Sequence, residues 1–159
     1  MSNLEIAWIF FEIADLLELK GENPFKVKAY RKAAKTIKRL PEELSKIWQE
    51  DRLQEIPGIG KNLGAKIVEL LTTGTCQLHE ELKSQVPVTL RELLAIPGLG
   101  AHSIRLIHRH LQVNTLDDLE KVAKERKIRT LPRMGSKTEL NILRSIEMLK
   151  RRKQGLIPV

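Results

Sequence analysis

The strongest constraint on the fold of this chain is a short turn sequence that recurs. Ile56-Pro57-Gly58-Ile59-Gly60 is repeated forty positions later as Ile96-Pro97-Gly98-Leu99-Gly100. A weaker third copy is Leu131-Pro132-Arg133-Met134-Gly135, in which Arg133 replaces the first glycine. Proline followed by glycine is typical of a tight turn, since proline fixes φ and glycine tolerates a positive φ. A turn repeated along the chain predicts several copies of one structural unit.

The segments on both sides of each turn follow helical periodicity. The first two turns are preceded by short amphipathic segments, at 52–55 and 90–95. All three turns are followed by longer helical patterns, at 61–71, 101–111 and 136–151. The repeated unit is therefore predicted to be a helix-hairpin-helix motif.

The rest of the chain also favours helices. Apolar residues recur at helical spacing over 3–20, and the segment 21–24, Gly-Glu-Asn-Pro, predicts the end of that helix. We expect further helices over about 25–39 and, opened by Pro41, over 41–48. Alternating runs rich in Val, Ile and Tyr, which would indicate strands, are missing. The predicted fold class is all-α.

The chain is predicted to form two compact helical domains with tandem helix-hairpin-helix motifs. Val86-Pro87-Val88 interrupts the helical pattern. We therefore expect a first domain over 1–84 with the first motif, and a second over 88–153 with the second and the degenerate third. Residues 154–159 would form a tail.

Some side chains have predicted structural roles. Thr115 is expected to cap a short helix whose first turn contains Asp117 and Asp118, because acidic residues are favourable there. Trp8 and Trp48 are expected to pack in the core of the first domain.

Charge indicates the kind of partner. The chain has 28 Lys and Arg against 20 Asp and Glu, a net charge of +8, and a pI near 9.7. Such an excess favours an anionic partner, and nucleic acid is the commonest one. Residues 20–39 contain eight basic residues and one acid, Glu22, so this segment is predicted to face DNA.

Other classes of protein fit the composition less well. Aromatic residues make up only 4% and no long apolar segment occurs, so a membrane partner is not expected. Cys76 is the single cysteine, which rules out a disulfide within the chain and fits a reducing compartment. With no targeting segment in the sequence, we expect a cytoplasmic, nucleoid-associated protein.

The glycines of the first two turns predict phosphate binding. A helix N-terminus carries unpaired N–H groups and partial positive charge, and glycines before it let a phosphate approach closely. Gly58, Gly60, Gly98 and Gly100 would provide that access. In the third copy Arg133 and Lys137 would contribute by charge. Phosphate contacts carry no base information, so the predicted binding is independent of DNA sequence.

The residues Asn23 to Ala34, Ile56 to Gly74 and Ile96 to Gly100 resemble the amino-terminal part of family X DNA polymerases, of the bacterial and polymerase beta type. The resemblance covers nearly the whole chain and corresponds to a lyase-type domain followed by a fingers-type domain. It implies binding of gapped, nicked or duplex DNA in base excision repair, with other DNA repair proteins as partners. The palm of that family, with its three metal-binding aspartates, is not expected in these residues.

The resemblance also implies a catalytic residue. In that family a lysine in the helix after the first hairpin removes a 5′-deoxyribose phosphate through a Schiff base, and Lys66 occupies its position. Lysine attacks an aldehyde only when unprotonated, so neighbouring cations and desolvation must lower its pKa. The cations implied around Lys66, which would also hold the phosphate, are Lys26, Arg31 and Lys61. The ring of Tyr30 would pack beside them.

This sequence departs from the family at two positions of the phosphate pocket. Asn62 stands where polymerase beta has a lysine, and Phe25 stands where it has a histidine. The pocket is therefore only partly retained. We keep two alternatives beside a DNA-binding module: a lyase acting through Lys66, and a protein-interaction module.

No cofactor is required by this interpretation, but the resemblance implies a monovalent cation at the hairpins. Sodium or potassium would bind backbone carbonyls and bridge protein and phosphate. By position these carbonyls belong to Gln54, Ile56 and Ile59 in the first hairpin and to Leu94, Ile96 and Leu99 in the second.

Overall fold

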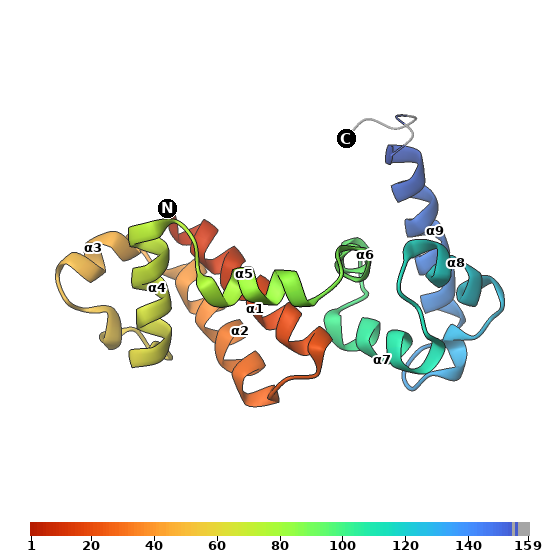
Figure 1. Cartoon of the computed structure of the whole chain (residues 1–159), viewed down its shortest axis with the longest axis horizontal. Helices are drawn as coiled ribbons and strands as arrows, with labels where there is room; N and C mark the ends of the chain where they lie inside the picture. The colour runs from red at the N-terminus through yellow and green to blue at the C-terminus, as the bar shows by residue number, and fades with distance from the viewer. Residues whose placement is uncertain (154, 156–159) are drawn as a thin grey trace. The chain divides into compact units, whose positions relative to one another are not determined.

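The computed structural model describes residues 1–153 and 155, so the predicted tail, except for Gly155, lies outside the described residues. The described part of the chain contains helices and no strand, which confirms the all-α fold class (Figure 1). None of these helices combines the length and apolar content needed to cross a bilayer. The chain divides into two compact units, Met1–Val86 and the residues from Pro87 onward.

The first unit is a packed set of helices with one short 3-10 helix. Its elements are α1 (Asn3–Lys20), α2 (Pro24–Arg39), α3 (Leu44–Gln49), the 3-10 helix η1 (Leu53–Glu55), α4 (Lys61–Thr73) and α5 (Gln77–Gln85). Helix α1 packs along α2 and against α5 (Figure 1). The core between them includes Phe10 and Tyr30, whose rings meet edge to face with centroids 5.3 Å apart.

Local signals determine the ends of the first two helices. The Ser2 side chain accepts a hydrogen bond from the Glu5 N–H at the start of α1, and Gly21, with φ 74°, ends that helix. The Asn23 side chain caps α2, whose first residue is Pro24. The predicted stop at residues 21–24 is therefore confirmed.

The predicted start of the third helix at Pro41 is wrong, because α3 begins at Leu44. The reason is a contact made by a residue far away in sequence. The Leu44 N–H donates to Asn3 Oδ1 at 2.8 Å, and Asn3 Nδ2 donates to the Glu42 carbonyl at 2.8 Å. These two hydrogen bonds from α1 hold the backbone before α3 in a non-helical path.

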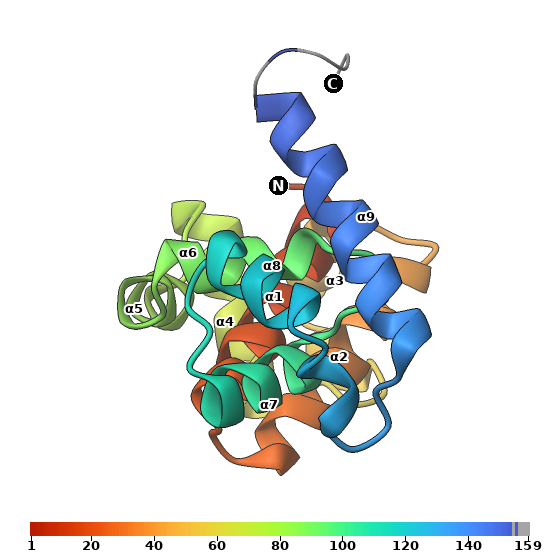
Figure 2. The ribbon, with the colours of Figure 1, turned by 90° about the vertical axis from the view of Figure 1, so that its right-hand side faces the viewer.

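The second unit carries the other two turns. Its elements are α6 (Val88–Arg91), the 3-10 helix η2 (Glu92–Ala95), α7 (Ala101–Leu111), α8 (Leu116–Lys124), the 3-10 helix η3 (Ile128–Thr130) and α9 (Ser136–Lys153). Helix α8 packs against α9 (Figure 2). Thr115 caps α8 by accepting a hydrogen bond from the Asp118 N–H at 3.0 Å, as predicted.

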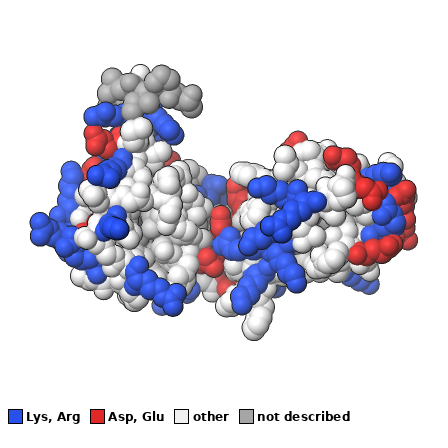
Figure 3. Space-filling view, turned by 180° about the vertical axis from the view of Figure 1, so that it is seen from behind, with Lys and Arg blue, Asp and Glu red and all other residues white. Residues whose placement is uncertain are grey.

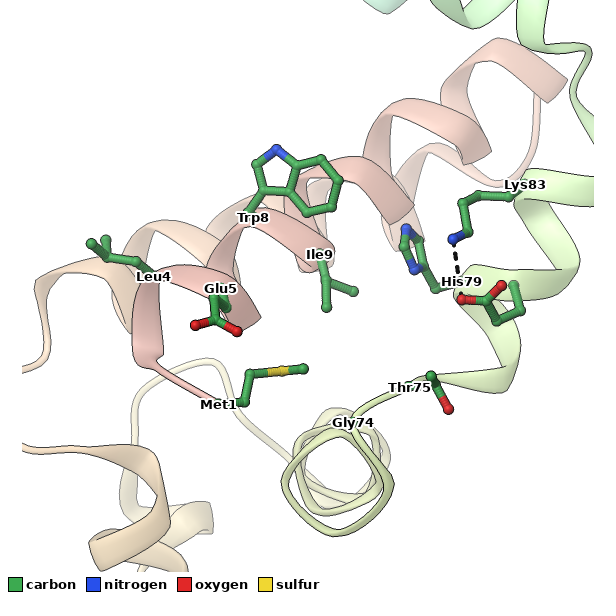
Figure 4. Close-up of a pocket in the computed structure, with 10 residues that line it drawn as sticks. Met1, Leu4, Glu5, Trp8, Ile9, Gly74, Thr75, His79 and Lys83 are labelled. Carbon is green, nitrogen blue, oxygen red and sulfur yellow. Dashed lines mark ion pairs between the residues drawn. The ribbon is translucent and has the colours of Figure 1, made fainter.

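Neither tryptophan lies in the core, so that prediction is wrong. Trp8 is 59% exposed and Trp48 is 37% exposed. Trp8 follows Leu4 by one helical turn on the open side of α1, where its ring and that of His79 meet edge to face with centroids 6.3 Å apart (Figure 4). The sequence indicates that these positions belong to helices, but helix packing decides which side of each helix is covered.

A cavity of about 520 Å³ lies beneath Trp8 in the first unit. Met1, Leu4 and Ile9 supply its apolar wall, and the turn after α4 closes it below (Figure 4). Its polar rim includes Glu80, whose carboxylate pairs with Lys83 at 3.1 Å. No residue predicted to bind DNA lines this cavity.

Candidate nucleic-acid interface

The first hairpin is a hydrogen-bonded turn between η1 and α4. The Ile59 N–H donates to the Ile56 carbonyl at 3.0 Å, which closes the four-residue turn. Pro57 occupies its second position, and Gly58, at the third, has φ 84°. A type II turn requires a positive φ at that position, where glycine is free of strain. The proline-glycine pair therefore determines the turn locally.

The other two copies make the same turn. In the second hairpin the Leu99 N–H donates to the Ile96 carbonyl at 3.1 Å, and Gly98 has φ 81°. In the third, the Met134 N–H donates to the Leu131 carbonyl at 3.2 Å. Arg133 takes the glycine position there with φ 62°, a conformation that is strained for a side chain with a Cβ atom. The third copy thus keeps the turn, although it has Arg133 where the other two copies have glycine, the residue best suited to that position.

Three of the four glycines in the first two hairpins face open space. The apolar residue between the two glycines of each hairpin is buried, with Ile59 2% and Leu99 5% exposed. A Cβ atom added at Gly58, Gly60 or Gly100 would meet no atom within 4 Å. The backbone at these glycines is therefore accessible to a ligand as well as to solvent.

Each of these turns leads into a helix without a side-chain cap. Helix α4 begins after Gly60 and α7 after Gly100, and neither glycine can cap with a side chain. The first N–H groups of a helix have no partner within the helix, and they carry partial positive charge. Because neither helix has an acid in its first turn, this end of each is suited to an anion.

The third hairpin differs at this point. Glu139 lies in the first turn of α9 and is only 3% exposed. Its carboxylate accepts hydrogen bonds from the Arg129 backbone N–H at 2.7 Å and from Nε and Nη2 of the same arginine at 2.9 and 2.8 Å. An acid in the first turn makes the start of α9 less suited to an external anion than the starts of α4 and α7. Lys137, which is exposed, would act by charge.

Asn141 connects the second and third hairpins. Its Nδ2 donates to the Pro97 carbonyl at 2.8 Å and lies 3.7 Å from the position of a Cβ at Gly98. Sequence reasoning missed this residue, since nothing in its position on α9 indicates a partner forty-four residues earlier.

Basic side chains gather on α2. This helix has seven Lys and Arg and no acid, and its buried residues lie on the opposite face. Figure 3 shows Lys and Arg side chains gathered on this part of the first unit. The exposed members, which we call the α2 basic stripe, are Lys26, Lys28, Lys32, Lys35, Lys38 and Arg39.

Two of the residues implied by the resemblance are engaged inside the first unit. Arg31 pairs with Asp15 at 2.8 Å and with Glu18 at 3.2 Å, so nearby carboxylates balance its charge. Tyr30 is only 4% exposed, and burial raises its pKa to about 12. Lys26 and Lys61, by contrast, are exposed.

Lys66 lies half-buried on α4, near the single cysteine. Burial raises the pKa of the Cys76 thiol, and the positive charge of Lys66 opposes that rise. Glu69, on the same helix, is occupied elsewhere: its Oε2 accepts a hydrogen bond from the Gln77 N–H at 2.8 Å and so caps α5.

The carbonyls predicted to hold a monovalent cation lie in and beside the turns. Those of Ile56 and Ile96 each accept the hydrogen bond that closes the turn. A carbonyl oxygen has two lone pairs, so this bond leaves one for a cation. Within the described ranges, no group of three or more His, Cys, Asp and Glu side chains is arranged to hold a metal ion.

Comparison with known proteins finds helix-hairpin-helix families and a bacterial DNA polymerase among the matches. Residues 1–76 match the family described as "Helix-hairpin-helix domain", and residues 90–148 match "SAM-like Helix-hairpin-helix tandem". The chain is 34% identical over 146 residues to "DNA polymerase/3'-5' exonuclease PolX" of Bacillus subtilis (strain 168). That match covers 92% of this chain and 25% of the relative, so the chain spans about a quarter of the relative's length.

Proposed function

Because the chain consists of helix-hairpin-helix domains homologous to the amino-terminal region of bacterial PolX-type DNA polymerases, we propose that it binds the DNA backbone without reading sequence. The observation that carries this proposal is the repeated open turn. Gly60 and Gly100 have free space in front of them and lie directly before helices with no acid in the first turn. Backbone N–H groups at such a helix start bind phosphate oxygens.

The α2 basic stripe supports the same function by a second route. Lysine side chains near the phosphates release condensed counterions, which makes affinity fall steeply with salt. Such binding depends little on sequence because every nucleotide carries the same phosphate. A protein-interaction module would lack this salt dependence, so a salt titration separates the two.

The test replaces the two glycines whose backbone conformation does not require glycine. Gly60 has φ −90° and Gly100 has φ −82°, both accessible to alanine, and both face open space. Gly60→Ala and Gly100→Ala should therefore fold with little loss of stability, while the new methyl groups keep a phosphate away from the N–H groups. We expect weaker binding to a fluorescent duplex.

The control is Ser45→Ala, an equally small change at an exposed position of α3, which should bind as the wild type does. Wild-type affinity in the Gly60→Ala, Gly100→Ala double variant would contradict the proposal.

We also propose a finer substrate and setting, which the resemblance to family X DNA polymerases implies. We propose gapped, nicked or duplex repair intermediates as substrates, other DNA repair proteins as partners, and a cytoplasmic, nucleoid-associated location. Sodium or potassium at the carbonyls of Gln54, Ile56 and Ile59, and of Leu94, Ile96 and Leu99, would bridge the hairpins to phosphate.

A second proposed function is removal of a 5′-deoxyribose phosphate by Lys66. It is supported by the position of Lys66 after the first hairpin, half-buried and on the same unit as the α2 basic stripe. The lysine amine would add to the C1′ aldehyde and release water to form an imine. Loss of a proton from C2′ would then break the C3′–O bond and release the strand with its 5′-phosphate, and water would hydrolyse the imine to free Lys66. Borohydride reduces the imine to a stable adduct before this elimination.

Trapping on incised abasic DNA tests this function. The wild type should form the adduct and Lys66→Ala should not, whereas Lys35→Ala should still form it. An adduct that persists in Lys66→Ala would assign the reaction to another amine, and no adduct from the wild type would remove the lyase function.

A further inference from the structure

A second cavity of the first unit lies beside the first hairpin and has a different lining from the apolar one. Its volume is about 490 Å³, within the ~300–1,000 Å³ range of small-ligand pockets. Helix α3 contributes Trp48, the segment around η1 contributes Asp51 and Gln54, and α4 contributes Lys61, Gly64 and Ala65.

Small residues keep the cavity open on the α4 side. Gly64 has no side chain, and the nearest atom to a Cβ placed there is Ile59 Cγ2 at 4.0 Å. Ala65, one residue further along, has only a methyl group and is exposed. The space that a larger residue would fill is therefore left to a ligand, next to the half-exposed ring of Trp48.

The polar groups of this lining match the parts of a nucleotide. An exposed indole ring stacks on any nucleobase. The Asp51 carboxylate accepts hydrogen bonds, and the Gln54 amide both donates and accepts, which suits the edge of an unpaired base. Lys61 follows Gly60 directly and offers a cation to the adjoining phosphate.

At the corresponding positions the second hairpin lacks the indole ring, the carboxylate and the amide. The equivalent of each lining residue lies forty positions later in the sequence. For Trp48, Asp51, Gln54, Lys61, Gly64 and Ala65, these equivalents are Val88, Arg91, Leu94, Ala101, Ile104 and Arg105. No aromatic ring and no amide is available there, and the small glycine is replaced by a buried isoleucine. The two hairpins share the turn, but the aromatic ring, the amide and the small glycine that line the cavity at the first have no equivalents at the second.

We propose that the cavity lined by Trp48, Asp51, Gln54 and Lys61 receives an unpaired nucleobase from the strand whose phosphate the first hairpin binds. This inference rests on the proposed function and adds a preference for DNA with unpaired bases. The second hairpin then binds paired or unpaired DNA alike, and the first discriminates between them.

The two tryptophans make the test direct, since the chain contains only Trp8 and Trp48. Trp8→Phe leaves Trp48 as the only tryptophan, and Trp48→Phe leaves Trp8 as the matched control. Each variant is titrated with three DNAs of equal length. The first is a paired duplex, and the second has a gap in one strand that leaves three thymines of the other strand unpaired. The third is the same gapped duplex with abasic residues in place of the three thymines.

We expect quenching of Trp48 fluorescence by the DNA with unpaired bases only, and no change in Trp8 fluorescence with any of the three. Trp48→Ala should reduce the preference for unpaired bases over abasic residues roughly tenfold, while affinity for the paired duplex stays the same. Ala65→Leu should have the same effect, because the leucine side chain fills the cavity. Leucine also favours a helix, and this variant keeps every side chain proposed to contact the base.

Equal quenching by the abasic DNA, or an undiminished preference in both Trp48→Ala and Ala65→Leu, would overturn the cavity proposal while leaving backbone binding intact. Failure of the wild type to bind the paired duplex would instead overturn the proposed function and this inference with it.

Discussion

The Asn141 side chain of α9 donates a hydrogen bond of 2.8 Å to the Pro97 carbonyl in the turn of the second hairpin. The third hairpin, whose helix α9 has the acid Glu139 in its first turn, thereby supports the turn of the second. A degenerate copy of the motif thus serves to position an intact one.

Asn141→Ala should weaken the second hairpin in both stability and binding. Loss of one such hydrogen bond costs about 1 kcal/mol of unfolding free energy. Duplex affinity should fall as well, because the turn that presents Gly98 loses its support. Met148→Ala, an exposed change on the same helix, is the control. Chemical denaturation and a duplex titration measure the two effects, and unchanged values in both would contradict the role given to Asn141.

Glu139 should make the stability of the second unit sensitive to acid. The side-chain hydrogen bond from Arg129 holds the pKa of Glu139 below its ordinary value of 4.5, and burial only partly opposes this. The folded state therefore binds the proton less readily than the unfolded state. The resulting stabilisation is complete above about pH 4.5 and is lost as the pH falls through the lowered pKa.

Thermal unfolding between about pH 3 and 7 tests this relationship. Glu139→Gln should lower the melting temperature near neutral pH and show a flatter acid limb than the wild type. Glu147→Gln, which removes an exposed carboxylate paired with Arg151 one turn away, should resemble the wild type. Parallel acid limbs in the wild type and Glu139→Gln would rule out the assigned linkage.

Arg133→Gly should stabilise the third hairpin. A non-glycine residue in the left-handed region costs roughly 1–2 kcal/mol, part of which is offset by the greater freedom of glycine in the unfolded chain. We expect a gain of about 1 kcal/mol by chemical denaturation. Arg133→Ala, which removes the charge and keeps the Cβ atom, should give no gain, and equal behaviour of the two variants would show that φ is not the cause.

The converse change in the first hairpin should be destabilising. Gly58→Ala places a Cβ at φ 84° and should cost roughly 1–2 kcal/mol. Gly60→Ala, two residues later at φ −90°, should cost little, although both methyl groups face open space. Equal stability of the two variants would show that the turn is not held by glycine at its third position.

Removal of the α2 basic stripe should reduce the salt dependence of binding. A variant with Lys28, Lys32 and Lys35 changed to Gln should bind duplex more weakly. Its plot of log affinity against log salt should become shallower by about 0.9 for each phosphate that the variant no longer neutralises. Binding measured at several salt concentrations gives this slope.

The control carries the same change of charge on the second unit. Lys121, Lys124 and Lys127 changed to Gln removes three lysines from α8 and the turn after it, where the last two lie near Glu120 and Glu125. An equal fall in slope for both triple variants would mean that net charge, and not the α2 basic stripe, determines the affinity.

The hairpins could be predicted from the sequence because their determinants are local. Proline and glycine at adjacent positions specify the turn, and Ile59 and Leu99 mark the buried side, all within five residues. The end of α1 at Gly21 and the cap of α8 at Thr115 are local in the same sense, since each depends on hydrogen bonds within five residues. For the same reason the glycines of the candidate site can be identified from the sequence alone.

What only the tertiary structure decided are the contacts between residues distant in the chain. Hydrogen bonds of Asn3 place the start of α3 at Leu44, and Asp15 and Glu18 form ion pairs with Arg31. The Asn141 side chain donates a hydrogen bond to the Pro97 carbonyl. Helical periodicity says which residues share a face, but not which neighbouring helix covers it, so the prediction for both tryptophans is wrong. The cavity beside the first hairpin depends on the packing of α3 against α4, and hydrophobic burial, which has no direction of its own, determines that packing only when the whole unit folds.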